Sequence, residues 1–144
     1  MVDTINSEAP RISTEVQVMF FDTDCAAVVH NIAYLRFIEV ARTLLAEQLG
    51  LGLSQMAQSQ KYPVVIRTEI DYRSAAMLGD RLVVEGRLDR LGRARFWCAF
   101  QIIRPADKAL IAECHQMLAI IQMPEAKVLR LPEEWEQYRT SDRA

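Results

Sequence analysis

The sequence contains little cysteine, glycine, proline or lysine. Its 144 residues include three cysteines, five glycines and five prolines, and only three of the seventeen basic residues are lysine. The cysteines (Cys25, Cys98 and Cys114) form no CxxC pair. Neither a disulfide framework nor a zinc ribbon is therefore indicated, and reduced thiols in a cytosolic protein fit better. The low glycine and proline content excludes a linker-rich chain, so we expect one globular domain.

Long apolar runs and a strong charge imbalance are also missing. The longest apolar stretches fall well short of the ~20 residues that span a bilayer. The polar start of the chain, over residues 1–10, lacks the basic and apolar regions of a signal peptide. The net charge of −2 argues against a general nucleic-acid binder. We predict a cytoplasmic protein with no membrane span and no nucleic-acid partner.

What the sequence does contain is a clear order of hydrophobic patterns. Residues 12–21 alternate apolar and polar side chains, as a strand does. Residues 33–49 have the period of a helix of four to five turns that is apolar around most of its circumference, and such a helix needs to be enclosed on more than one side. Four further alternating segments follow, joined by short turns. This order predicts an α+β fold in which a five-stranded antiparallel sheet wraps around one long central helix.

The two ends of the chain differ from this central part. Residues 1–10 are polar, and we predict a disordered lead there. Residues 11–123 hold the long patterns and form the predicted domain, with a second short helical turn over residues 51–58. Residues 124–144 form a polar, proline-interrupted tail, in which residues 132–135 predict one exposed helical turn.

The turn between the first strand and the helix holds the candidate chemistry. Asp22 and Asp24 lie two residues apart, just before apolar residues and the helix start. A carboxylate beside apolar surface can act as a base when its pKa is raised, or as a nucleophile when it stays ionised. The free N–H groups of a helix start can stabilise a developing oxyanion. Together these groups suit acyl transfer; the alternative is that the carboxylates only cap the turn.

The run FFDTDCAAVVHNIAYLRFIEVAR, over residues 20–42, resembles the signature of the 4-hydroxybenzoyl-CoA thioesterase family, which includes the acyl-CoA thioesterases associated with the tol-pal system. The positions that match the signature are Asp22, Asp24, Val29, Tyr34, Glu39, Ala41 and Arg42. Further along, residues 71–76 and Gly79-Asp80 resemble the family's second marker, where a strand ends in a small-residue turn. The resemblance covers about residues 12–122.

This resemblance implies a hot-dog fold and an acyl-CoA thioesterase that works without metal as a homodimer or homotetramer, with its site between subunits. By the same resemblance, Asp24 is the catalytic carboxylate and the backbone N–H of Asn31 polarises the thioester carbonyl. Tyr34 and Glu39 are expected near the site. No cofactor is implied, because the CoA moiety is part of the substrate.

Two positions depart from the family pattern. Ala27 stands where the family usually has glycine, and its Cβ costs energy if the loop needs a positive φ there. Asn31 stands where relatives often have an aromatic or histidine side chain, so we expect a differently lined acyl pocket. Neither change removes the carboxylate.

Four further side chains are candidates for substrate binding. His30 is expected to be a positioning or pocket residue. Arg73, Arg90 and Arg93 are candidates for contacts with the phosphate groups of CoA, which guanidinium groups suit. A solvated sheet face is the alternative reading of these arginines. Cys25 and His30 would make a Cys–His nucleophile, but no third group is evident that would orient them.

We therefore expect hydrolysis of an acyl-CoA or acyl-carrier-protein thioester to a free acid and a thiol, with Asp24 as nucleophile or general base. Two alternatives stay open. A hot-dog enoyl hydratase or dehydratase would use a histidine together with a carboxylate, and His30 and His115 are the two histidines. A non-catalytic hot-dog protein would bind acyl-CoA and release no thiol. The aromatic residues fit a ring-bearing substrate and core packing equally well.

Overall fold

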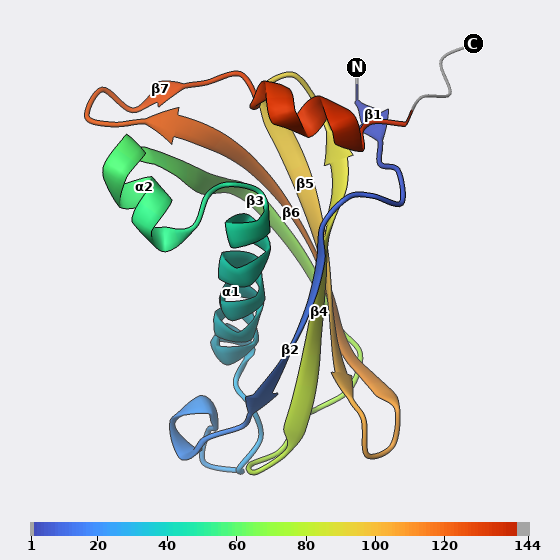
Figure 1. Cartoon of the computed structure of the whole chain (residues 1–144). Helices are drawn as coiled ribbons and strands as arrows, with labels where there is room; N and C mark the ends of the chain where they lie inside the picture. The colour runs from blue at the N-terminus through green and yellow to red at the C-terminus, as the bar shows by residue number, and fades with distance from the viewer. Residues whose placement is uncertain (1, 141–144) are drawn as a thin grey trace.

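The computed structural model describes residues 2–140 of the chain. Its elements, in chain order, are β1 (Asp3–Thr4), β2 (Arg11–Gln17), the 3-10 turn η1 (Phe20–Asp22), α1 (Asn31–Gln48), α2 (Leu53–Ser59), β3 (Lys61–Tyr72), β4 (Arg81–Leu91), β5 (Arg95–Arg104), β6 (Ala109–Gln122), β7 (Lys127–Val128) and η2 (Glu133–Tyr138), also 3-10. Figure 1 shows the strands forming one bent sheet with α1 packed against its inner face.

The sheet is antiparallel throughout, and its long strands follow the order β2, β4, β5, β6, β3. The short strands β1 and β7 pair with β4 and β6. The described sheet therefore has seven strands, not the five that the sequence predicts. The five predicted strands are all present, and the two additional ones are each two residues long, which is too short to show a hydrophobic period.

The helix α1 confirms the long helix expected near residues 33–49. It ends at Gln48, and the Leu51 N–H donates to Ala46 O at 2.8 Å. This bond crosses Gly50, whose φ of +84° is a left-handed conformation that glycine adopts freely. Residues after this cap lead directly into α2, which matches the short helix expected at residues 51–58.

In the single chain, the sheet covers one half of α1. The buried half packs through Phe37, Ile38, Ala41 and Leu45, which are each at most 1% exposed. On the flanks of the opposite side, Leu35, Val40 and Leu44 each keep more than a third of their surface exposed. The enclosure on more than one side that the sequence predicts is therefore only partly present within one chain.

The start of the chain is not the disordered lead that its polar composition predicts. Asp3 and Thr4 pair with the end of β4. The Asn6 N–H donates to Tyr138 O at 2.9 Å, and Asp3 forms an ion pair with Arg139 at 2.8 Å. These partners lie more than 80 residues away in the sequence, so local composition gives no sign of them.

The predicted helical turn near the C-terminus is present, but it is not exposed. Trp135 in η2 has 2% of its surface exposed, and its Nε1–H donates to Leu49 O at 3.0 Å. Its ring meets the ring of Phe96 edge to face, with centroids 5.0 Å apart. The C-terminal segment thus closes the far end of the core, above α1 in Figure 1. Within residues 2–140, no helix has the length and apolar character needed to cross a membrane.

Candidate active site

The loop between β2 and α1 folds back on itself and presents Asp24. β2 ends at Gln17, four residues before the end of the strand predicted for residues 12–21, because the chain turns into η1. Beyond η1, the Asp24 N–H donates to Val28 O at 3.0 Å, and the Ala27 N–H donates to Asp24 O at 3.0 Å. The position of Asp24 is therefore set by the backbone of the loop itself.

The two carboxylates of this loop have different surroundings. Asp22 has 1% of its surface exposed; its Oδ2 accepts the Met19 N–H at 2.9 Å, and its Oδ1 forms an ion pair with Arg36. Asp24 is exposed, and its Oδ1 accepts the Ala26 N–H at 2.9 Å. Its Oδ2 has no hydrogen-bond partner in the described part of the chain. Asp22 therefore anchors the loop to α1, whereas Asp24 keeps one oxygen free.

The helix start offers a backbone donor without a partner. His30 caps α1, since its Nδ1 accepts the Ala33 N–H at 3.2 Å. The Asn31 N–H has no acceptor among the described residues, as is usual for the first residue of a helix. It lies at the positive end of the helix dipole, where a negatively charged oxygen is stabilised. The donor expected to polarise a carbonyl is thus available, and His30 acts as a helix cap.

This cap also argues against a Cys–His nucleophile. Cys25 is exposed, but one ring nitrogen of His30 is already occupied by the Ala33 N–H. Burial raises the pKa of the Cys98 thiol to about 12 and that of the Cys114 thiol to about 11. Both buried thiols therefore stay protonated at neutral pH and are poor nucleophiles.

Ala27 adopts the strained conformation that its departure from the family pattern suggested. Its φ is +61°, in the left-handed region that costs a residue with a Cβ about 1–2 kcal/mol. The hairpin needs this conformation because the Ala27 N–H and the Ala27 carbonyl are both hydrogen-bonded, to Asp24 O and to the Leu78 N–H. The loop thus keeps the backbone shape that glycine would adopt freely.

Replacing Ala27 with glycine is expected to raise the free energy of unfolding by about 0.5–1 kcal/mol, because the relief of strain exceeds the greater freedom of glycine in the unfolded chain. Urea unfolding measures the change. Ala26→Gly is the matched control: the neighbouring residue has no positive φ, so we expect a loss of about 0.5–1 kcal/mol. Equal losses in the two variants would show that the loop stores no strain.

Tyr34 links the helix start to the segment between β3 and β4. Its side chain is buried, its ring centroid lies 5.4 Å from that of Tyr72, and its Oη accepts the Ala76 N–H at 3.1 Å. The Tyr72 hydroxyl donates to Asn31 O at 3.3 Å. Tyr34 and Tyr72 therefore connect the first turn of α1 to the end of β3 and to the segment that follows it.

Glu39 lies two turns further along α1, about 12 Å from Asn31 at 1.5 Å per residue. It is exposed and forms an ion pair with Arg42 at 3.5 Å. Arg42 also donates to Gln116 Oε1 at 2.9 Å, and Gln116 Nε2 donates to Thr68 Oγ1 at 3.2 Å. Within one chain, Glu39 thus extends a polar bridge between α1 and the sheet and does not meet the Asp24 loop.

The three candidate arginines lie at two ends of the molecule. Arg73 follows β3 at the end near the helix start, where it pairs with Glu113 at 3.0 Å. Arg90 stacks on the ring of Trp97 at 5.1 Å, and Arg93 lies in the turn after β4. β4 runs away from the Asp24 loop for about 30 Å at 3.3 Å per residue, toward the top of Figure 1. Arg90 and Arg93 are therefore not part of the Asp24 site within one chain.

The segment between β3 and β4 (residues 73–80) is the part of the site that the sequence pattern signals weakly. The Val29 N–H donates to Ala76 O at 2.9 Å, and the Leu78 N–H donates to Ala27 O at 2.9 Å. The segment therefore supports the hairpin from outside. Its sequence signal is the second family marker, which consists of residues 71–76 and the Gly79-Asp80 pair.

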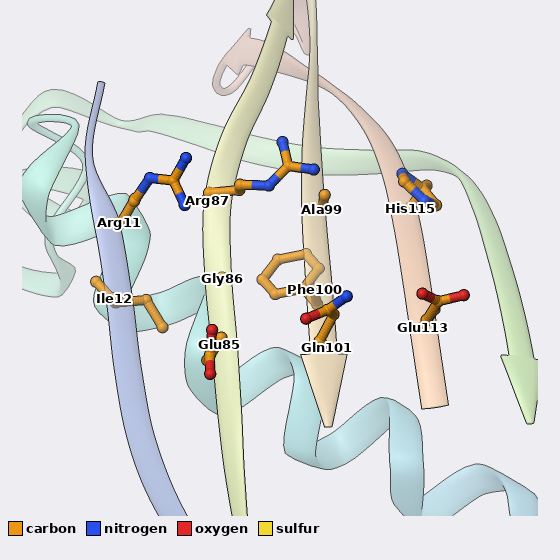
Figure 2. Close-up of a pocket in the computed structure, with 10 residues that line it drawn as sticks. All are labelled: Arg11, Ile12, Glu85, Gly86, Arg87, Ala99, Phe100, Gln101, Glu113 and His115. Atoms are coloured by element: carbon orange, nitrogen blue, oxygen red, sulfur yellow. The ribbon is translucent and has the colours of Figure 1, made fainter. Parts of the chain in front are cut away.

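A hollow of about 230 Å³ lies elsewhere, on the outer face of the sheet. Figure 2 shows its lining residues in rows across the strands: Arg11, Arg87, Ala99 and His115, then Ile12, Gly86 and Phe100, then Glu85, Gln101 and Glu113. None of the predicted site residues lines it. His115, which the sequence pattern places simply on a strand, is exposed on this face. Residues 2–140 contain no group of three or more acidic, histidine or cysteine side chains arranged to hold a metal ion.

Comparisons with known proteins agree with this architecture. A model of the thioesterase-like superfamily matches residues 18–137. The acyl-CoA thioesterase YbgC of Haemophilus influenzae and a 1,4-dihydroxy-2-naphthoyl-CoA hydrolase of Synechocystis are each 28% identical to the chain over 123 residues, which are 85% of this chain and 89% of each relative. The crystal structure of Slr0204, a 1,4-dihydroxy-2-naphthoyl-CoA thioesterase from Synechocystis, matches with a TM-score of 0.78 and 26% identity, over 89% of this chain and 94% of that one.

The family match includes both the Asp24 hairpin and the buried Trp135. The neighbouring structures share the antiparallel sheet packed around a helix, which is the hot-dog arrangement that the sequence resemblance implies. The chain belongs to the thioesterase-like superfamily.

Proposed function

We propose that the protein hydrolyses an acyl-CoA thioester, or the corresponding acyl-carrier-protein thioester, to a free acid and a thiol in the cytoplasm. The observation that carries this proposal is the pairing of two groups in one short loop. The Asp24 carboxylate keeps a free oxygen, and seven residues later the Asn31 N–H is a free donor at the start of α1. The names of the relatives, an acyl-CoA thioesterase and an acyl-CoA hydrolase, support the same substrate class.

The proposed chemistry begins with the thioester carbonyl oxygen accepting a hydrogen bond from the Asn31 N–H, which becomes stronger as negative charge develops on that oxygen. Asp24 then acts in one of two ways. It attacks the carbonyl carbon, expels the thiolate and leaves a mixed anhydride that water hydrolyses, or it takes a proton from a water molecule that attacks instead. These steps use side-chain and backbone groups alone, and the CoA moiety leaves as the thiol product.

We further propose that the working form is a homodimer or homotetramer with its sites between subunits. Among the described strands, β3 pairs with β6 only, so its other edge is unpaired. Val65 and Ile66 on this strand keep 40% and 46% of their surface exposed. A long, apolar open edge favours pairing with another chain. A second copy along β3 would cover that edge, whose end meets the start of α1 through the hydrogen bond from Tyr72 to Asn31 O.

Arg73 is the candidate among the three arginines for contact with CoA, since it follows β3 at the end where Tyr72 meets Asn31. Its guanidinium already pairs with Glu113 and Asp71, at 3.0 and 3.8 Å. Phosphate would therefore have to share or replace these partners. In an oligomer, Arg90 and Arg93 would contribute only to the site of another subunit.

Thiol release from a panel of short, medium, long and aromatic acyl-CoAs tests the proposal. We expect release well above the uncatalysed rate for at least one class, measured with a thiol reagent after subtraction of the signal from the exposed Cys25. Calorimetric binding of acyl-CoA with no thiol release across the panel would show a non-catalytic binding protein. Water addition to an enoyl thioester, assayed in parallel, would instead show a hydratase.

A further inference from the structure

The hairpin that carries Asp24 is held by its own backbone hydrogen bonds and by Asp22, and the 73–80 segment adds contacts from a distant part of the chain. This segment contacts the hairpin through Val29 and Ala27, and it contacts α1 through the hydrogen bond from the Ala76 N–H to Tyr34. The loop that carries Asp24 and the start of α1, which carries the Asn31 N–H, thus both contact the same eight residues. Any shift of the segment would move Asp24 relative to the Asn31 N–H.

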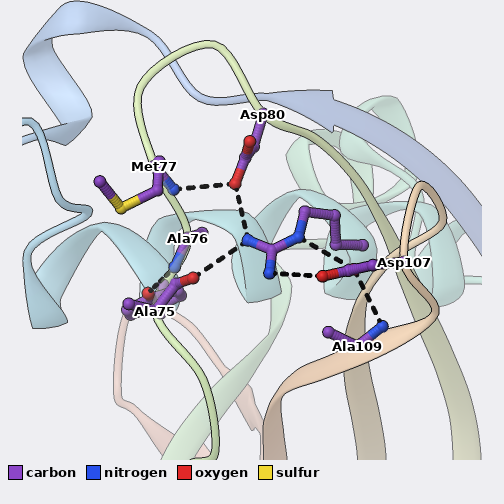
Figure 3. Close-up of polar contacts among 8 residues, drawn as sticks. Ala75, Ala76, Met77, Asp80, Asp107 and Ala109 are labelled. Atoms are coloured by element: carbon purple, nitrogen blue, oxygen red, sulfur yellow. Dashed lines mark hydrogen bonds and ion pairs between the residues drawn. The ribbon is translucent and has the colours of Figure 1, made fainter.

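A single arginine binds this segment at two positions. Arg104 is the last residue of β5, and 20% of its side chain is exposed. Its Nη1 donates to Ala75 O at 3.1 Å and to Asp80 Oδ2 at 2.9 Å; in Figure 3 these bonds are the dashed lines that end at the labelled Ala75 and Asp80. The same oxygen of Asp80 accepts the Met77 N–H at 2.9 Å. The guanidinium therefore closes the segment into a ring between Ala75 and Asp80.

The other side of the same guanidinium is tied to the sheet. Arg104 Nε and Nη2 donate to the two carboxylate oxygens of Asp107, at 3.0 and 2.9 Å. Asp107 in turn accepts the Ala109 N–H at 3.2 Å, at the start of β6. The hydrogen bonds from Arg104 hold the pKa of the Asp107 carboxyl below its ordinary value. This bidentate contact between Arg104 and Asp107 fixes the orientation of the guanidinium group as well as its distance from the carboxylate.

We propose that Arg104 is a positioning residue for thioester hydrolysis. It fixes the 73–80 segment on the sheet. Through that segment it holds the Asp24 carboxylate and the Asn31 N–H at a fixed distance and orientation relative to each other. This inference depends on the proposed function. A misplacement of about 1 Å at a reacting group lowers rates by about 100-fold, so a residue that never touches substrate can control kcat.

Arg139 provides a matched control. It is also an arginine with a mostly buried side chain, 15% exposed, and it binds the carboxylates of Asp3 and Glu136 and the carbonyl oxygens of Leu91 and Gly92. These partners lie at the end of the sheet opposite to the Asp24 loop. Arg104→Gln and Arg139→Gln should therefore lower the unfolding temperature by similar amounts, while their kinetic effects differ.

We expect kcat to change much more than KM in Arg104→Gln, when both constants are measured below the unfolding transition of each variant. Arg104→Gln should lower kcat by about 10- to 100-fold with KM changed less than about threefold, while Arg139→Gln keeps kcat within about twofold. Arg104→Lys retains the positive charge but loses the planar guanidinium group with its several donors. Its kcat should therefore lie between those of Arg104→Gln and the wild-type protein. Asp107→Asn, a change at an exposed turn, provides a variant expected to fold normally and to lower kcat by a smaller factor.

Amide hydrogen exchange gives a readout that does not depend on activity. In Arg104→Gln the Val29 and Leu78 N–H groups should exchange faster, and in Arg139→Gln they should not. Wild-type kcat in Arg104→Gln, or an equal fall in both glutamine variants, would overturn the positioning role, as would a change confined to KM. Absence of hydrolysis by the wild-type protein would refute the proposed function itself, and exchange would then decide separately whether Arg104 orders the loop.

Discussion

Replacement of Asp24 with asparagine is expected to lower kcat for thioester hydrolysis by about 100- to 10,000-fold, the range that a positioned base supplies. Asparagine has almost the same size and keeps a side-chain oxygen for the Ala26 N–H, so the hairpin should retain its shape. What it lacks is the negative charge that attacks the carbonyl or takes a proton from water. Steady-state thiol release with the best acyl-CoA of the panel, together with unfolding curves, measures both effects.

Asp22→Asn is the control for this experiment, because it removes the other carboxylate of the same loop. Asp22 is buried against Arg36 and the Met19 N–H, so we expect a loss of about 1–3 kcal/mol in the free energy of unfolding. The Asp24 variant should lose much less stability and far more activity. Near wild-type thiol release by Asp24→Asn would remove this carboxylate from the mechanism.

Replacement of Trp135 with alanine should lower the free energy of unfolding by about 3–5 kcal/mol, as truncation of a buried aromatic side chain does. The change removes the packing against Phe96 and the hydrogen bond from the indole to Leu49 O. It also opens the core at the end of α1 that η2 closes. Guanidinium unfolding followed by circular dichroism measures the loss without relying on tryptophan fluorescence.

Trp97 is the matched control, since it is the second tryptophan and lies on the outer face of the sheet, where it contacts Arg90. It is only partly buried, and Trp97→Ala should cost about 1 kcal/mol. A loss at Trp135 no larger than at Trp97 would mean that the C-terminal segment is not part of the folded unit.

The long elements could be predicted because their signals are local. The period of residues 33–49 marks a helix and the alternating segments mark strands, since in each case the side chains that share a face are two to four residues apart. The departure at Ala27 was equally readable, because a missing glycine predicts strain at one position. These expectations hold in the structure to within a few residues, except where β2 gives way to η1.

The departures from these expectations share a different cause. Arg90 and Arg93 stay candidates for contact with CoA, but the direction of β4 places them at the opposite end of the sheet from Asp24 of the same chain. The lead over residues 1–10 was predicted to be disordered and the turn that contains Trp135 to be exposed, because their partners are far away in the sequence. Each of these positions is decided by contacts across the fold, which leave no mark on neighbouring residues.

The sequence by itself determined that this chain builds a long helix packed against an antiparallel sheet, and that two carboxylates precede the helix start. Periodicity and turn chemistry act over a few residues, so both features are visible in the order of amino acids. Only the tertiary structure decided that Asp22 is buried beneath Arg36 while Asp24 keeps a free oxygen. It also decided that Arg104, eighty residues further along, binds the 73–80 segment, which contacts the loop that carries Asp24. The reason is that burial and hydrogen bonding depend on which distant segments meet, and packing alone brings them together.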